Sequence, residues 1–172
     1  NLDQALMFRD EPLRMLTSFE LALEQSADIH PQALQRLTRG LPAFGSATRA
    51  NPEASAIFLK ILTSKHNPER VLRLMNESGV LGRYLPDFGR TVPMMQFDMY
   101  HSYTVDEHTI QVIGILHDIE AGKLTETAPV ASAVMPEIES RQTLFVAALL
   151  HDSAKGRGGD HSELGADLAL EL

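Results

Sequence analysis

The chain has 172 residues, of which 44% are hydrophobic, enough for one compact domain whose folding needs no disulfide or partner. Cysteine is absent, which excludes disulfides, thiolate nucleophiles and cysteine zinc sites and leaves nitrogen and oxygen atoms as metal ligands. The net charge of −8 argues against a nucleic-acid partner, and the absence of a long apolar run or signal peptide argues against a membrane or secreted protein.

Apolar residues recur at three- and four-residue steps and β-branched alternation is scarce, which predicts an all-α fold. Helix starts are predicted at prolines near the first helical position: Pro12, Pro31, Pro52, Pro68 and Pro136. Asn51 and Asn67 are expected to cap two of these helices, and the second helix should end at Ser78-Gly79, where glycine accepts a left-handed backbone. Loops are predicted over residues 40–45, 82–93 and 156–159.

The segment beginning at Thr104 has the form of a capping box with Glu107, so a helix is predicted from there to about Gly122. Its expected apolar stripe consists of Val105, Val112, Ile115 and Ile119. His108 falls within that stripe and should point inward. A histidine on an apolar face is usually a hydrogen-bonded core residue, so a metal-ligand role requires a partner elsewhere in the chain.

That partner is predicted in residues 144–152, where an apolar and therefore buried helix ends in His151-Asp152. Burying a carboxylate without compensation is costly, and a divalent cation would supply the compensation. Consecutive helical residues project about 100° apart, so the pair can approach one metal from two directions or bridge two metals, with His108 closing the site. Imidazole and carboxylate ligands suit manganese, iron, cobalt or zinc and do not decide among them.

Three segments carry a resemblance to a known family: YTVDEHTI (103–110), FVAALLHDSAKGRGGDHS (145–162) and VLRLMNESGVLGRYLPDFGR (71–90). They are similar to the metal-dependent HD-superfamily phosphohydrolase domain of bacterial bifunctional uridylyltransferase/uridylyl-removing enzymes. The likeness covers nearly the whole chain. An HD pair alone is weak evidence, because a second pair at His117-Asp118 lacks the following Lys and Gly and is interpreted as a surface accident.

The resemblance implies an HD-type helical bundle in which His108, His151 and Asp152 bind a divalent metal, with Mn²⁺ or Mg²⁺ favoured. It implies hydrolysis of a phosphodiester or uridylyl-tyrosine bond by an activated water. Asp152, Lys155 and His161 are the expected catalytic residues. The implied partner is the uridylylated nitrogen-regulatory PII protein, the implied effector is glutamine acting on domains outside this chain, and the implied location is the cytoplasm.

Each residue beyond the three ligands has an alternative reading. Lys155 can neutralise charge on phosphoryl oxygens or serve as a cation near a helix C-terminus. His161 follows Asp160 and can line the site, bind a second metal or have neither role. His101 precedes the expected Thr104 cap, so helical spacing does not place it. Only surface roles are expected for the remaining two histidines discussed, His30 and His66.

Two departures from the family pattern stand out. Ser153 replaces the usual apolar residue after the HD pair and is expected to tune the packing behind the ligands. The superfamily's last aspartate ligand would lie beyond Leu172, and Asp160 and Asp167 are too close to replace it. Because the chain starts at Asn1 and stops within an expected helix, we expect a longer protein, with a transferase domain upstream and glutamine-sensing domains downstream.

The sequence therefore leaves three hypotheses. The first is uridylyl removal from the PII protein; the second is an HD-type hydrolase of a small nucleotide; the third is a non-catalytic helical scaffold with an incomplete metal site.

The chain is predicted to divide into an N-terminal helical region at residues 1–90 and an HD core at residues 91–172. The first region is expected to support the hydrolase site, although the same helices could form a spacer between domains.

Overall fold

The computed structural model describes residues 7–91 and 104–152, and within these ranges the chain forms helices, turns and loops without a strand. This confirms the all-α prediction. Residues 7–10 are helical. They are followed by α2 (Arg14–Glu24), α3 (Pro31–Gly40), η1 (Leu41–Ala43), α4 (Ser46–Arg49), α5 (Pro52–Leu62), α6 (Pro68–Glu77), α7 (Val80–Tyr84), α8 (Pro86–Thr91), α9 (Val105–Glu120), α10 (Pro129–Val134), η2 (Met135–Glu137) and α11 (Arg141–Leu150).

Most of the predicted helix starts are confirmed. Pro31, Pro52 and Pro68 are each the first residue of a helix. Asn51 caps α5 by accepting a hydrogen bond from the Glu53 backbone N–H, whereas the side chain of Asn67 forms no such bond. The remaining two prolines precede a helix less directly. Pro12 lies in the turn before α2, and Pro136 lies in η2, so α11 begins only after the Ser140 cap.

Glycine ends one helix as predicted, whereas a segment that was predicted as a loop from its glycines and prolines is helical. Gly79 follows α6 with φ of +80°, the left-handed conformation expected of a helix stop. The predicted loop over residues 82–93 is wrong in its described part, because α7 ends at Tyr84 and α8 follows at once. Two short helices fit there because Gly82 and Gly89 have no side chains where α7 and α8 meet.

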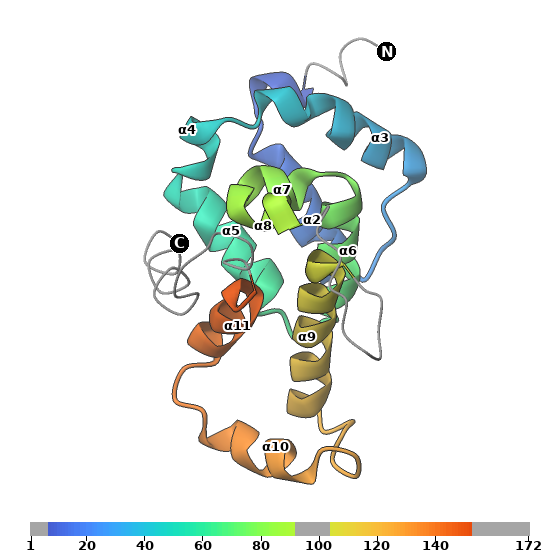
Figure 1. The fold of residues 1–172 in the computed structure, drawn as a ribbon. Coiled ribbons are helices and arrows are strands. Elements are labelled where there is room, and N and C mark those ends of the chain that lie inside the picture. The colour runs from blue at the N-terminus through green and yellow to red at the C-terminus, as the bar shows by residue number, and fades with distance from the viewer. Residues whose placement is uncertain (1–6, 92–103, 153–172) are drawn as a thin grey trace.

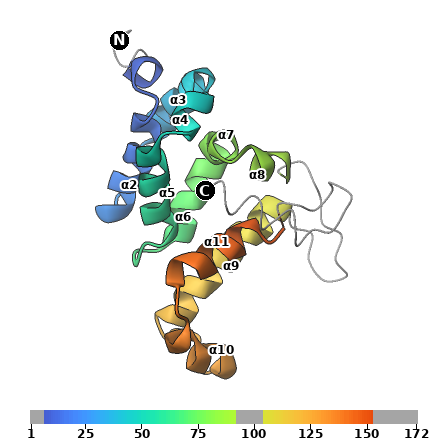
Figure 2. The ribbon, with the colours of Figure 1, turned by 90° about the vertical axis from the view of Figure 1, so that its left-hand side faces the viewer.

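One hydrophobic core joins helices from both halves of the chain. It contains Phe19, Phe58 and Met75 from the first half together with Ile113 and Phe145 from the second. Helix α9 packs on α6 and α11, and α2 packs on α5 (Figure 1). In both ribbon views α9 and α11 run side by side from this core toward α10, which lies at the end of the molecule away from the N-terminus (Figure 2). The candidate ligands lie at the opposite ends of these two helices from α10.

The buried face of α9 differs from the predicted apolar stripe. Its buried residues are Val105, Asp106, Thr109, Ile110, Ile113, Gly114 and His117, whereas Ile115 is 43% exposed. The error has a physical cause, because α9 is packed on both α6 and α11 and buries polar as well as apolar side chains. No described helix is long and apolar enough to cross a membrane.

Candidate metal centre

His108, His151 and Asp152 come together although 42 residues of sequence lie between the first two. One potential ligand atom from each lies within 4.8 Å of the others. Asp152 Oδ2 is 3.4 Å from His151 Nε2 and 3.9 Å from His108 Nε2. Within residues 7–91 and 104–152 this is the one such group of metal-ligating side chains. The three residues that the sequence singled out as ligands therefore lie at a common point.

The carbonyl of Ala148 determines which nitrogen of His151 faces this point. His151 Nδ1 lies 2.6 Å from that backbone oxygen, a hydrogen-bond distance. A carbonyl only accepts, so Nδ1 carries the proton and donates it, and Nε2 keeps its lone pair. A hydrogen bond of this kind orients many metal-binding histidines. His151 is thus prepared to bind a cation through Nε2.

The burial of the three side chains gives the site a closed base and an open side. The side chain of Asp152 is 6% exposed, whereas those of His108 and His151 are 41% and 39% exposed. His108 was expected to point inward from α9, and that expectation is wrong, because the ring is half exposed beside the equally exposed His151 ring. Their ring centroids are 5.7 Å apart and tilted by 59°. A largely buried carboxylate beneath two accessible imidazoles fits a divalent cation that also contacts solvent or substrate.

Polar contacts with α6 position the first turn of α9, which carries His108. The Asn76 side-chain amide donates to Asp106 Oδ2 over 2.6 Å, and Arg73 pairs with Glu107. Glu107 was expected to complete a capping box, but the Thr104 side chain forms no capping bond and the Glu107 carboxylate is paired with Arg73 instead. These two contacts involve the residues directly before His108 and fix the turn from which its ring projects.

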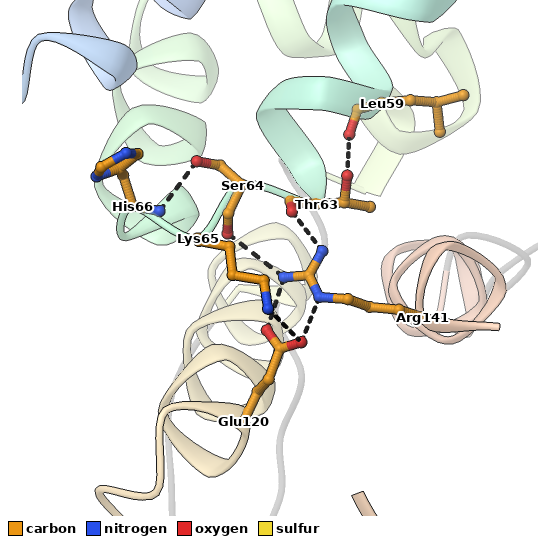
Figure 3. A network of polar contacts seen from close by, with 7 residues as sticks. All are labelled: Leu59, Thr63, Ser64, Lys65, His66, Glu120 and Arg141. Carbon is orange, nitrogen blue, oxygen red and sulfur yellow. Dashed lines mark hydrogen bonds and ion pairs between the residues drawn. The ribbon is translucent and has the colours of Figure 1, made fainter. Parts of the chain in front are cut away.

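Helix α11 positions His151 and Asp152 through apolar and ionic contacts at its two ends. Phe145 and Leu149 are fully buried in the common core. Near the start of the helix, Arg141 binds both carboxylate oxygens of Glu120, with Nη2 2.7 Å from Oε2 (Figure 3). The prediction that α11 is buried on all sides is wrong, because Ala147 is exposed and several other residues are only partly buried.

Arg141 also ties α11 to the loop between α5 and α6. Its guanidinium donates to the backbone oxygens of Thr63 and Ser64, and its Cζ lies 4.5 Å from the centroid of the Phe145 ring. The hydrogen bond from Arg141 lowers the pKa of the Glu120 carboxyl, to which Lys65 adds a weaker contact at 3.8 Å. The close-up shows Arg141 at the centre of this network, between α9, α11 and the loop (Figure 3).

The interpretation of the second HD pair as a surface accident is wrong for its histidine. His117 is 8% exposed, and its buried Nδ1 forms no hydrogen bond within the described residues. Burial lowers the pKa of this imidazole. Asp118 is partly exposed and pairs with Lys123 at 2.7 Å. His117 and Asp118 belong to no group of three metal-ligating side chains among the described residues, so they make no second metal centre there.

Several residues predicted for the site fall outside the described ranges, namely Lys155, His161, Asp160, Ser153 and His101. Sequence reasoning in turn missed the contacts that hold the site together: Asn76 with Asp106, Arg73 with Glu107, and Arg141 with Glu120. Their partners are 21 to 34 residues apart, so no local spacing rule connects them.

These observations define a class of protein: an all-α domain with a candidate metal centre made of two histidines and one aspartate. Residues 1–84 match the family model described as the third domain of uridylyltransferase GlnD. The chain is 55% identical over all 172 residues to the bifunctional uridylyltransferase/uridylyl-removing enzyme of Azospirillum brasilense. Over 165 residues, 96% of the chain, it is 51% identical to the enzyme of that name from Novosphingobium aromaticivorans and 50% identical to that from Rhodospirillum rubrum.

These relatives confirm one part of the resemblance, the similarity of this chain to a part of bifunctional uridylyltransferase/uridylyl-removing enzymes. It spans 18% of the length of each of the three relatives. No solved structure matches the chain.

Proposed function

We propose that this chain contains the HD-type phosphohydrolase centre of a uridylyl-removing enzyme, and that its substrate is the uridylylated PII protein. The observation that carries the proposal is the meeting of three potential ligand atoms, from α9 and the end of α11, within 4.8 Å. The name of the relatives, which includes uridylyl removal, supports the reaction class. The division into residues 1–90 and 91–172, and a cytoplasmic location, belong to the same proposal.

In this centre His108 and His151 would bind a divalent cation through Nε2, and Asp152 would bind it through its carboxylate. The cation would supply Lewis acidity and lower the pKa of a water molecule. Ala148 would keep the His151 ring oriented during binding, because its carbonyl accepts the Nδ1 proton. Mn²⁺ and Mg²⁺ are the proposed cations, and iron, cobalt and zinc suit the same donor set.

The proposed reaction is a hydrolysis. Water attacks phosphorus and loses a proton, the bond from phosphorus to the tyrosine oxygen breaks, and the tyrosine oxygen takes up a proton, which gives uridine 5′-monophosphate and the unmodified tyrosine. Lys155 is proposed to neutralise charge on the phosphoryl oxygens, and His161 to line the site or bind a second metal. Glutamine is proposed to act through domains that are not part of this chain.

The release of uridine 5′-monophosphate from uridylylated PII protein tests this proposal. The assay compares the unchanged chain with Asp152→Asn, which removes the carboxylate charge, and with His66→Ala, a histidine exposed on the loop before α6. We expect release that depends on Mn²⁺ or Mg²⁺, retention of it in His66→Ala, and a loss of at least a hundredfold in Asp152→Asn.

Other outcomes would point to the two alternative hypotheses. Metal-dependent hydrolysis of small nucleotides without release from PII would contradict the proposed substrate and favour a nucleotide hydrolase. Failure to bind metal, together with no hydrolysis, would contradict the whole proposal and favour a helical scaffold.

A further inference from the structure

A cavity of about 360 Å³ lies where α4, α5, α7 and α8 meet the end of α11. Leu150 forms part of its wall and is followed directly by His151 and Asp152. Because consecutive Cα atoms are about 3.8 Å apart, this wall lies within one or two residues of the candidate ligands. The cavity and the candidate metal centre therefore meet at the end of α11, where Leu150 lines the first and the next two residues belong to the second.

The volume suits one small organic group. Ligand pockets in proteins commonly measure about 300–1,000 Å³, so this cavity is at the small end of the range. Its wall combines apolar surface from Leu85, Phe88 and Leu150 with the hydroxyl groups of Ser46 and Ser55. Apolar surface suits the faces of a flat heterocycle, and hydroxyl groups can both donate to and accept from its polar edge.

The same wall carries groups suited to the rest of a nucleotide. Arg49 contributes a guanidinium, which attracts a ligand that bears a phosphate, and Asp87 contributes a carboxylate that can accept from hydroxyl or ring N–H groups. The Tyr84 hydroxyl lies 3.4 Å from Ser55 Oγ. Burial raises the pKa of Tyr84 above its ordinary value, which already keeps a tyrosine hydroxyl protonated at neutral pH.

Packing behind the cavity keeps this wall in place. The centroids of the Tyr84 and Phe58 rings are 4.7 Å apart. The Tyr84 ring also meets the Phe44 ring edge-on, with 6.3 Å between these two centroids. A Cβ added at Gly82 would come within 2.9 Å of the Gly89 Cα, so the backbones of α7 and α8 are in close contact. A binding wall that is already formed loses little conformational entropy when a ligand enters.

We propose that this cavity binds the nucleoside of the nucleotidyl group whose phosphate lies at the His108, His151 and Asp152 centre. The inference rests on the proposed function and adds to it a binding site for a pyrimidine nucleoside. The cavity recognises the leaving nucleotide, so specificity for the nucleotide comes from this chain's own α4, α5, α7 and α8.

The test fills the cavity without touching the candidate ligands. Ala50→Phe places a large ring in the wall at an exposed position after α4. Ala47→Phe is the matched control, because Ala47 is exposed within α4, three residues earlier, but lines a different cavity. Calorimetry measures the binding of Mn²⁺, of uridine 5′-monophosphate with Mn²⁺ present, and of uridine alone.

We expect the unchanged chain and Ala47→Phe to bind both uridine compounds, and Ala50→Phe to bind them at least tenfold more weakly with unchanged Mn²⁺ affinity. Equal affinity in both variants, or no binding of either compound to the unchanged chain, would overturn the nucleoside site. Uridine has no phosphate, so its binding tests the cavity even if Mn²⁺ does not bind. Absence of Mn²⁺ binding would instead contradict the proposed function.

Discussion

The guanidinium of Arg141 binds both carboxylate oxygens of Glu120 and thereby joins the start of α11 to the last turn of α9. The two helices carry the candidate ligands at their other ends, with His108 near the start of α9 and His151 after the end of α11. The position of α9 relative to α11 therefore decides how far apart the candidate ligands lie. The Arg141 contact is therefore expected to affect both the stability of the fold and the geometry of the metal centre.

Replacing Arg141 with Ala should lower the free energy of unfolding by about 2–3 kcal/mol, because it removes several charge-assisted hydrogen bonds and leaves Glu120 partly buried without its main partner. Urea denaturation followed by circular dichroism measures the change. Arg9→Ala is the control, since Arg9 and its partner Asp10 are both well exposed, and it should change stability by less than about 0.5 kcal/mol. A loss in Arg141→Ala no larger than in the control would contradict the role given to this contact.

Acid should weaken the contribution that Glu120 makes to the free energy of unfolding. Arg141 holds the pKa of the Glu120 carboxyl below its usual value, so in the folded chain Glu120 stays ionised at a pH where the unfolded chain takes up a proton. Its contribution to stability is full above the unfolded pKa and disappears as the pH falls through the folded pKa. We expect the difference in unfolding free energy between the unchanged chain and Glu120→Gln to shrink between pH 6 and pH 3. A difference that stays constant over this range would count against the prediction.

His117 should make stability depend on pH over a higher range. Burial lowers the pKa of this imidazole, with Lys123 and Arg141 acting in the same direction and Asp118 and Glu120 opposing them. The unfolded chain then binds a proton more readily, so the stability associated with a neutral His117 is present above about pH 6.5 and declines as the pH falls from there toward the folded pKa.

His117→Gln should reduce the loss of stability between pH 7 and pH 5, measured by urea denaturation at each pH. An NMR titration of the unchanged chain should also find the His117 ring protonated at a lower pH than in the urea-unfolded chain. The same pH dependence in both proteins, together with an ordinary titration, would show that His117 does not have the buried environment described here.

The sequence predicted the helical class and the meeting of His108, His151 and Asp152 better than it predicted the faces of the helices. Proline and glycine act locally, so the starts at Pro31, Pro52 and Pro68 and the stop at Gly79 could be predicted from neighbouring residues. The buried face of α9 depends on two helices from distant parts of the chain. Its burial of Asp106 is possible because Asn76 of α6 supplies a hydrogen bond, which periodicity does not reveal.

The end of α7 and the whole of α8 fall in the segment 82–93, which was predicted as a loop because it contains glycine and proline, yet glycine has a packing role there. Gly82→Ala should destabilise the chain by about 1–3 kcal/mol, since the new Cβ would come within 2.9 Å of backbone at Gly89. Gly45→Ala is the matched control: nothing lies within 4 Å of its Cβ and its φ is negative, so it should be neutral or slightly stabilising. Thermal denaturation of both variants decides the point, and equal melting temperatures would contradict the close packing of α7 on α8.

The metal centre is tested by the metal content and Mn²⁺ affinity of the unchanged chain beside His151→Ala and His66→Ala, measured by elemental analysis and calorimetry. We expect stoichiometric metal in the unchanged chain and in His66→Ala, and no bound metal in a folded His151→Ala protein. Equal metal binding by all three proteins, or none in the unchanged chain, would contradict the assignment of His108, His151 and Asp152 as a metal centre.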